Sequence, residues 1–261
     1  MSKPRGKCVF CNGFGLTRSH IWPEWSQKIL PSTAARYEIT VGDTMETFTQ
    51  TAPGPPFFKT SRPGSAAKRQ PRNTCLECNS GWMRSIEEAA KPIVTNLIRG
   101  RHFLLTTIDQ RLLATFLCLI SMRIELSGEL RTTPQEHRNW LISKREPPPN
   151  WWISFCRYQD NDPVDYWFGF LGMARASLSE ATLVGAHNCN TQVTTIIVGN
   201  FCAHLFSSTV WDNFRGYDGA SLAQIWPPNP YIIDTEFVAF IDNSGLPWLH
   251  EAVARDGIQP E

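Results

Sequence analysis

Two pairs of cysteines have the spacing found in zinc-binding knuckles. Cys8 and Cys11 form the first pair, and Cys75 and Cys78 form the second. A two-residue spacer in a tight turn lets both sulfurs of a pair point at one ion, and two pairs complete a tetrahedral site. In a reducing compartment such pairs indicate metal rather than disulfides. We therefore predict one structural zinc ion. The alternatives are free thiols or a redox pair, but no thioredoxin-like strand–helix context surrounds either motif.

The residues around each pair favour a thiolate. Gly13 follows the first pair and tolerates a positive φ, so backbone amides can face the sulfurs. The second pair stands at the start of a predicted helix, where the helix dipole favours negative charge. The helical spacing is carried by a stripe of apolar residues, namely Trp82, Ile86, Ala89, Ile93 and Leu97. Pro92 is expected to kink or end this helix.

The elements that must position these cysteines follow the order of a treble clef. A knuckle and a short hairpin come first, and a CxxC that opens a helix follows at a distance. Between them, residues 52–72 are rich in Pro, Gly, Ser, Lys and Arg, which predicts a long, mobile, basic loop. Residues 1–100 are thus expected to form a small zinc-stabilised module.

Two segments of this module resemble the HNH endonuclease superfamily. The segment LTRSHIWPEW, residues 16–25, resembles the first histidine motif of that superfamily. The segment from Cys75 to Glu87 resembles the CN-GWM-E ending of its bacterial and phage members. The resemblance covers roughly residues 1–90. It implies a ββα-metal fold that hydrolyses phosphodiester bonds of DNA with one Mg²⁺ or Mn²⁺ ion.

The resemblance also implies roles for individual residues. His20 matches the general base that draws a proton from the attacking water, a task for which imidazole is suited. Asn79 matches the position that holds the catalytic cation, and Asn73 is the nearest asparagine for the middle motif position. Ser19 stands where the family commonly has an acidic metal ligand. Glu87, two turns beyond Asn79, could supply the missing charge.

Plainer interpretations of the same residues remain open. His20 could cap or fill a small domain, and Glu87 could be a solvated or capping residue. Trp22, Trp25 and Trp82 could stack on bases or could be hydrophobic staples of a domain too small for a deep core. A catalytically inactive zinc module that binds nucleic acid or protein is therefore the alternative to a nuclease.

The net charge of +1 hides an asymmetry along the chain. Residues 1–101 carry 15 Lys/Arg against 7 Asp/Glu, whereas residues 102–261 carry 10 against 17. The basic part is the candidate for a polyanion such as DNA, unless the two parts attract each other within the fold. The candidate phosphate contacts are Arg18, Lys68, Arg69, Arg72 and Arg84.

Residues 101–261 predict a larger α+β domain. Helical patterns occupy residues 106–145, and β-branched and aromatic runs fill residues 151–242. We expect helices packed on an antiparallel sheet. No residue assigns a role to this domain, which could bind a ligand or partner while the zinc module braces it. Its single cysteines are predicted to be buried apolar residues, namely Cys118, Cys156, Cys189 and Cys202.

The chain carries no pattern of a membrane protein. Its longest apolar stretch, residues 112–120, is shorter than the roughly 20 residues that a membrane span needs. The first residues are basic but lack the apolar region of a signal peptide. We therefore expect a cytoplasmic protein. The oligomeric state is not indicated.

Overall fold

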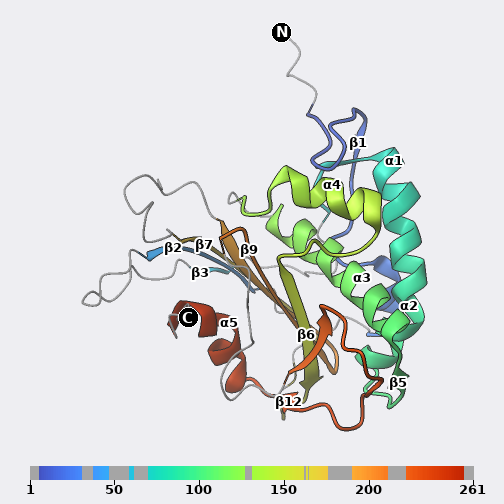
Figure 1. Cartoon of the computed structure of the whole chain (residues 1–261), viewed down its shortest axis with the longest axis vertical. Coiled ribbons are helices and arrows are strands. Elements are labelled where there is room, and N and C mark those ends of the chain that lie inside the picture. Colours follow the sequence, from blue (N-terminus) through green and yellow to red (C-terminus); the bar gives the residue numbers. More distant parts are fainter. Residues whose placement is uncertain are drawn as a thin grey trace.

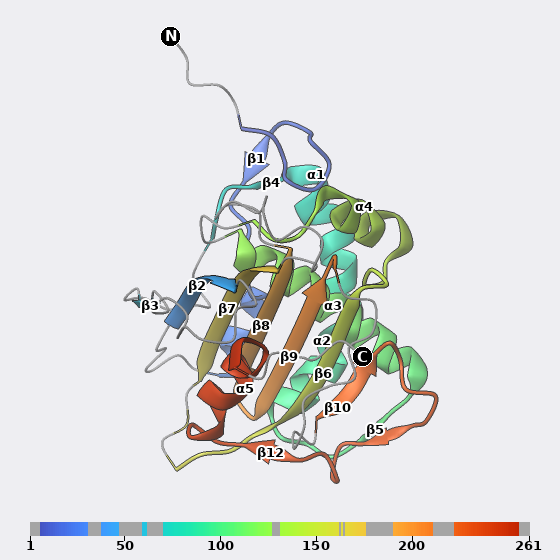
Figure 2. The same ribbon diagram turned by 60° about the vertical axis from the view of Figure 1, so that its left-hand side comes forward.

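The computed structural model describes residues 6–30, 38–46, 59–61, 70–126, 131–161, 163, 165–175, 190–210 and 222–255. They form a mixed α/β fold with a twisted sheet between helices (Figure 1). Helices α2 (Arg84–Ile98) and α3 (Thr107–Glu125) lie on one side of the sheet. Helix α5 (Gly245–Arg255) lies on the other side (Figure 2), where the sequence predicted no helix. The predicted combination of helices and antiparallel strands is thus present, but helices cover both faces of the sheet, whereas the sequence predicted them on one face.

The main sheet has the strand order β10-β6-β9-β8-β7-β2-β3, and β12 pairs with β6 beside this path. Its four central strands, β6, β9, β8 and β7, pair antiparallel with one another. The strands of this sheet are β2 (Glu38–Glu46), β3 (Lys59–Ser61), β6 (Trp151–Tyr158), β7 (Tyr166–Arg175), β8 (Thr191–Val198), β9 (Phe201–Ser208), β10 (Ala223–Trp226) and β12 (Phe240–Ile241).

The turn between β8 and β9 explains how α2 reaches the sheet. Gly199 in this turn has a φ of +57°, and a Cβ there would lie 2.7 Å from the carbonyl oxygen of Ile98. Both the backbone and side-chain nitrogens of Asn200 donate to the same oxygen at 3.1 Å. Only glycine lets the end of α2 approach so closely.

The end of the strand-rich region predicted for residues 151–242 is only partly formed as strands. Strand β11 (Ile233–Asp234) pairs with β5 (Leu104–Leu105), and β12 pairs in parallel with β6. Between them the chain turns at Asp234. The side-chain carboxylate of Asp234 accepts from the Glu236 amide at 3.0 Å, and the backbone carbonyl of Asp234 accepts from the Phe237 amide at 3.2 Å. Phe237 is 84% exposed, so its aromatic character misled the prediction.

Strands β2 and β3 come from the insert between the two cysteine pairs. β2 pairs in parallel with β7, and β3 pairs antiparallel with β2. Residues 59–61 are thus a short strand within the segment predicted as a loop, and the rest of 52–69 lies outside the described residues. The segments on either side of residue 100 share this sheet, and one hydrophobic core extends from Cys8 to Leu249.

The helices follow their sequence signals with one exception. Thr106 and Asp109 form a capping box at the start of α3, where the predicted helical pattern begins, with the Asp109 amide donating to the Thr106 hydroxyl at 3.2 Å. Helix α4 (Gln135–Lys144) begins after Pro134. Pro92 was expected to kink or end the second-knuckle helix, but α2 runs through it to Ile98. In the described part of the chain, no helix has both the length and the apolarity to cross a membrane.

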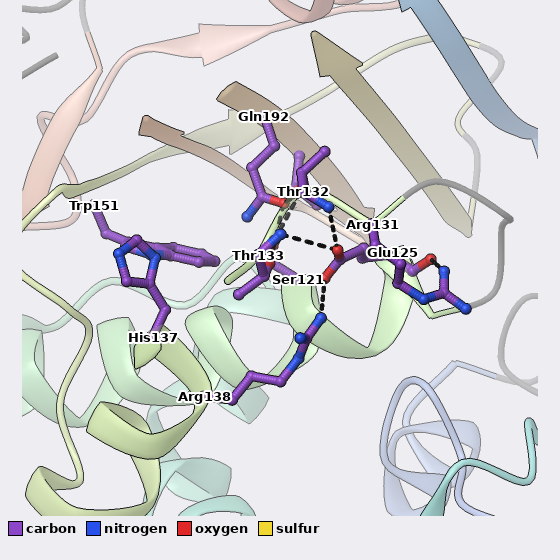
Figure 3. A network of polar contacts seen from close by, with 10 residues as sticks. Ser121, Glu125, Arg131, Thr132, Thr133, His137, Arg138, Trp151 and Gln192 are labelled. Atoms are coloured by element: carbon purple, nitrogen blue, oxygen red, sulfur yellow. Dashed lines mark hydrogen bonds and ion pairs between the residues drawn. The ribbon is translucent and has the colours of Figure 1, made fainter. Parts of the chain in front are cut away.

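A buried network of polar groups anchors α4 (Figure 3). The Glu125 carboxylate at the end of α3 accepts from Arg138 Nη2 at 3.0 Å and from the Thr133 amide at 2.9 Å. The side-chain oxygen of Gln192 on β8 accepts from the hydroxyls of Thr132 and Thr133. Removal of one partner from such a buried ion pair lowers the free energy of unfolding by about 3–5 kcal/mol. The network therefore fixes α4 against α3 and the sheet.

Candidate metal centre

The four knuckle cysteines meet in space. Their Sγ atoms all lie within 4.8 Å of one another, and the Sγ atoms of Cys11 and Cys75 are 3.6 Å apart. In a tetrahedral site with Zn–S bonds of about 2.3 Å, neighbouring sulfurs are separated by about 3.8 Å. These four residues could therefore hold a metal ion such as zinc, as the spacing predicted.

The first knuckle is closed by its own backbone. The Cys8 amide donates to the Gly13 carbonyl, and the Asn12 amide donates to the Cys8 carbonyl, both at 2.8 Å. The Gly13 amide faces the Cys11 sulfur at 3.4 Å, as expected. The positive φ of 60°, however, belongs to Asn12 rather than to Gly13. Gly13 is needed for space instead, because a Cβ there would lie 3.1 Å from the Cys11 sulfur.

The second knuckle lies at a junction of strand and helix. Cys75 ends β4 (Thr74–Cys75), and Cys78 ends α1 (Leu76–Cys78). The Cys78 amide donates to the Cys75 sulfur at 3.4 Å, so Cys75 caps α1. A π-helical segment, Asn79–Met83, follows and breaks helical geometry at Gly81. The chain therefore bends directly after the cysteines, before α2 begins.

A two-stranded ladder joins the two knuckles. β1 (Leu16–Thr17) pairs antiparallel with β4, so that Leu16 faces Cys75. The Val9 amide donates to the Asn73 carbonyl at 3.0 Å, and the Leu76 amide donates to the Gly15 carbonyl at 3.3 Å. These bonds bring together cysteines that are 64 positions apart, Cys11 and Cys75.

Burial opposes negative charge on these sulfurs. It raises the pKa of the Cys78 thiol strongly, against a smaller lowering by the Trp82 side chain, and it also raises the pKa of Cys11. Burial acts on Cys8 as well, but nearby backbone N–H groups outweigh it and lower the pKa of that thiol. A bound cation would remove this conflict by displacing the protons.

The histidine segment lies against the residues that follow the second knuckle. Ser19 is buried, and its hydroxyl donates to Asn79 Oδ1 at 2.9 Å. His20, the next residue, is half-buried, and its Nε2 lies 2.6 Å from Nε2 of Gln70. An amide nitrogen can only donate, so this contact makes Nε2 of His20 the acceptor and leaves the ring proton on Nδ1.

Two other predicted site residues are occupied by different partners. Asn73 Oδ1 accepts from the Thr74 hydroxyl at 3.1 Å, and the backbone carbonyl of Asn73 accepts from the Val9 amide of the first knuckle. Glu87 Oε1 lies 2.6 Å from Arg123 Nη1 on α3, in a largely buried ion pair. Arg123 also donates to the sulfur of Met83 at 3.4 Å. Glu87 is thus neither solvated nor a helix cap, and its charge is balanced by Arg123.

The predicted phosphate contacts are only partly within the described residues. Arg18, Arg72 and Arg84 are exposed, whereas residues 68 and 69 lie outside the described part. Arg72 donates to the Leu16 carbonyl at 3.5 Å, which places it beside β1.

The aromatic residues of this region divide into core and surface. Trp22 is fully buried and packs edge-on against Phe116 of α3 at 5.2 Å between ring centroids, so it belongs to the shared core and cannot stack on a base. Phe14, which the sequence did not single out, is 65% exposed. Lys7 Nζ lies 6.0 Å from its ring centroid. Its position between Gly13 and Gly15 was the one sequence signal that it lies in a bend of the chain.

Comparison of the chain with protein-family models, with curated proteins and with solved structures found no match. Its function must therefore be inferred from its own residues. Sequence reasoning missed Gln70 as the partner of His20, because a contact across 50 positions leaves no local pattern.

Proposed function

We propose that this protein is a metal-dependent HNH-type endonuclease that hydrolyses phosphodiester bonds of DNA, built as a treble clef around a structural zinc ion. The observation that carries the proposal is the hydrogen bond between Ser19 and Asn79, which are 60 positions apart. It joins the residue before the proposed base to the proposed cation ligand. If the chain has the fold that the resemblance implies, the histidine segment at residues 16–25 must lie against the segment that begins at Cys75.

The oxygens of Ser19 and Asn79 have a spacing suited to one small cation. They lie 2.9 Å apart, and adjacent oxygens around an octahedral Mg²⁺ with bonds of about 2.1 Å have about the same separation. These residues would hold Mg²⁺ or Mn²⁺, with other positions left to water and phosphate. The ion, when bound, would offset the charge that develops on the phosphate and the leaving oxygen.

His20 would act as the general base through Nε2. In this structure that nitrogen accepts from the Gln70 amide at 2.6 Å, so its lone pair is directed at a donor. A water molecule in place of this amide would donate to the same lone pair and could give up its proton. The proposed reaction therefore requires Gln70 to move aside when substrate binds.

A second candidate is a zinc module that binds nucleic acid without cleaving it. It is favoured by the ion pair of Glu87 with Arg123, which leaves that carboxylate unavailable to a cation, and by the neutral Ser19. The exposed surface of Phe14, Lys7 and Arg72 suits either candidate, since an aromatic ring can stack on a base while cations contact phosphates.

Plasmid cleavage by the purified protein separates the two candidates. The nuclease should cut DNA with Mg²⁺ or Mn²⁺ and not with EDTA. His20→Ala should abolish cutting while zinc content and folding stay intact, and Asn79→Ala should raise the metal concentration required. His102→Ala is the matched control, because His102 is exposed and lies outside this site. DNA binding without cutting under any divalent metal would favour the binding module.

A further inference from the structure

Helix α4 contacts residues beside the cysteine centre near both of its ends. At its start, Gln135 Nε2 donates at 2.9 Å to the carbonyl of Phe10, a residue inside the first knuckle. At its end, the Arg145 guanidinium lies 4.9 Å from the ring centroid of Trp82, just after the second knuckle. Figure 1 shows α4 beside β1 and α1. A helix from the second half of the chain thus contacts residues next to both cysteine pairs of the first half.

Trp82 stands between this helix and the cysteines. Its ring packs edge-on against Phe10 at 5.6 Å. Its indole N–H is buried and has no partner at hydrogen-bonding geometry among the described residues. Trp82 follows Cys78 by four residues in the helical segment Asn79–Met83, about one turn further along the chain. A metal-bound thiolate is a better acceptor than a thiol, so this N–H has a partner once Cys78 ligates a cation.

Arg145 brings a positive charge to the same place. Its backbone is left-handed, with a φ of 56°, and its carbonyl accepts from the Thr115 hydroxyl at 3.1 Å. Burial lowers the pKa of Arg145, and negative charge on Cys78 opposes that shift. Four thiolates around a divalent ion keep a net negative charge, which a guanidinium stacked on the adjacent indole would offset.

We propose that Trp82 and Arg145 are positioning residues that form an outer layer of the metal centre. The indole N–H donates to the Cys78 thiolate, and the guanidinium offsets the charge of the four thiolates. Metal binding and the docking of the end of α4 therefore strengthen each other. The proposal rests on metal binding by the cysteines and not on nuclease activity.

The rest of α4 is held independently of the cysteines, so it forms a rigid support. Arg138 binds Glu125, and Trp151 Nε1 donates to His137 Nδ1 at 3.1 Å (Figure 3). Loss of either outer-layer contact should therefore leave the helix in place. An effect on the metal can then be separated from an effect on folding.

The test measures metal affinity in Trp82→Phe, Arg145→Gln and Arg145→Lys by competition with a chromogenic zinc chelator. Outer-layer partners of metal ligands typically contribute at least about tenfold to affinity. We expect about tenfold weaker zinc binding in Trp82→Phe and Arg145→Gln, and recovery toward wild type in Arg145→Lys. In the Co²⁺-substituted protein, the sulfur-to-cobalt charge-transfer band should move to longer wavelength in Trp82→Phe, because the thiolate loses a donor.

The same helix offers a matched control. Trp140 also has a buried indole N–H for which the described part of the chain offers no partner, and Lys144 Nζ lies 5.9 Å from its ring centroid. Trp140→Phe and Lys144→Gln should leave zinc affinity and the Co²⁺ spectrum unchanged.

Three results would overturn the proposal. The first is wild-type affinity and spectrum in Trp82→Phe and Arg145→Gln, and the second is an equal loss of affinity in the Trp140 control. The third is a wild-type protein that binds neither Zn²⁺ nor Co²⁺, which would remove the metal centre itself. A failure of DNA cleavage would leave the outer layer untouched.

Discussion

Around the cysteines the regular elements are very short, whereas the sheet is built from long strands. β1 and β4 have two residues each, and α1 has three. The central strands β6, β7, β8 and β9 have eight to ten residues, and most of their described side chains are buried. A few short elements cannot bury enough apolar surface to offset the entropy of ordering them. We therefore expect the cysteine region to depend on a metal cross-link and the sheet to depend on its core.

Removal of the metal should have the largest effect, and it should affect the cysteine region while sparing the sheet. Zinc binding to such peptides contributes roughly 10–16 kcal/mol, and this energy drives folding. In Cys75→Ser, or after chelation, backbone amides of residues 6–30 and 70–83 should lose protection from hydrogen exchange, while those of β6, β8 and β9 keep theirs. Cys118→Ser, at a buried cysteine outside the centre, should leave protection around the knuckles unchanged. Equal loss of protection in sheet and knuckles would contradict the comparison.

A change in the buried polar network should destabilise the sheet and its helices and leave the cysteine region unaffected. Arg138→Met leaves the buried Glu125 carboxylate without its cation, which should lower the free energy of unfolding by about 3–5 kcal/mol. Urea unfolding measures this loss, and zinc content should not change. Glu125→Leu combined with Arg138→Met should be less destabilising than the single change. If the loss in free energy of unfolding of the double variant equalled the sum of the losses in Glu125→Leu and Arg138→Met, the two residues would not act as a pair.

A smaller effect is expected from pH, again on the sheet. Burial, and then His250, lower the pKa of His204 to about 3, whereas an unperturbed histidine has a pKa of 6.5. Between these values the unfolded chain binds more protons than the folded one. The free energy of unfolding therefore falls as the pH drops below 6.5, by about 1.4 kcal/mol per pH unit.

Urea unfolding at pH 7.5 and pH 5.0 measures this dependence. The wild type should lose about 2 kcal/mol more than His204→Gln between the two conditions. The variant keeps a polar group near Thr195, whose hydroxyl lies 2.9 Å from His204 Nδ1. An unchanged pH dependence in the variant would show that His204 is not the titrating group.

The smallest expected effect concerns binding of DNA by the basic region. Neutralising Lys68, Arg69 and Arg72 together should lower the affinity about tenfold and flatten its salt dependence, because fewer counterions are released. Stability should not change. Neutralising Arg99, Arg101 and Arg111, which are exposed outside the proposed nuclease site, is the control. Equal losses in both triple variants would place the DNA contacts elsewhere.

Patterns within a few residues of one another were predictable from the sequence. The two CxxC pairs lie together as predicted, and helix α3 begins after Thr106, at the start of the predicted helical pattern. The β-branched and aromatic region predicted at residues 151–242 contains the central strands β6, β7, β8 and β9. These signals are local, because a spacer, a cap or a period is fixed by neighbouring residues.

Contacts between distant segments were not predictable. No local feature shows that Glu87 pairs with Arg123, or that β2 joins β7 in parallel. The contact of Arg145 with Trp82 also depends on how α4 docks, which the sequence near either residue does not encode. The candidate site was therefore anticipated in its cysteines and in the approach of Ser19 to Asn79, but not in the partners that surround them.

X-ray absorption at the zinc edge of the purified protein tests the central claim most directly. We predict one zinc ion per chain, surrounded by four sulfur ligands at about 2.3 Å. The sulfur positions in the structure, all within 4.8 Å of one another, allow this arrangement without rearrangement of the backbone. A first shell with nitrogen or oxygen ligands, or a protein that retains no zinc, would contradict the account.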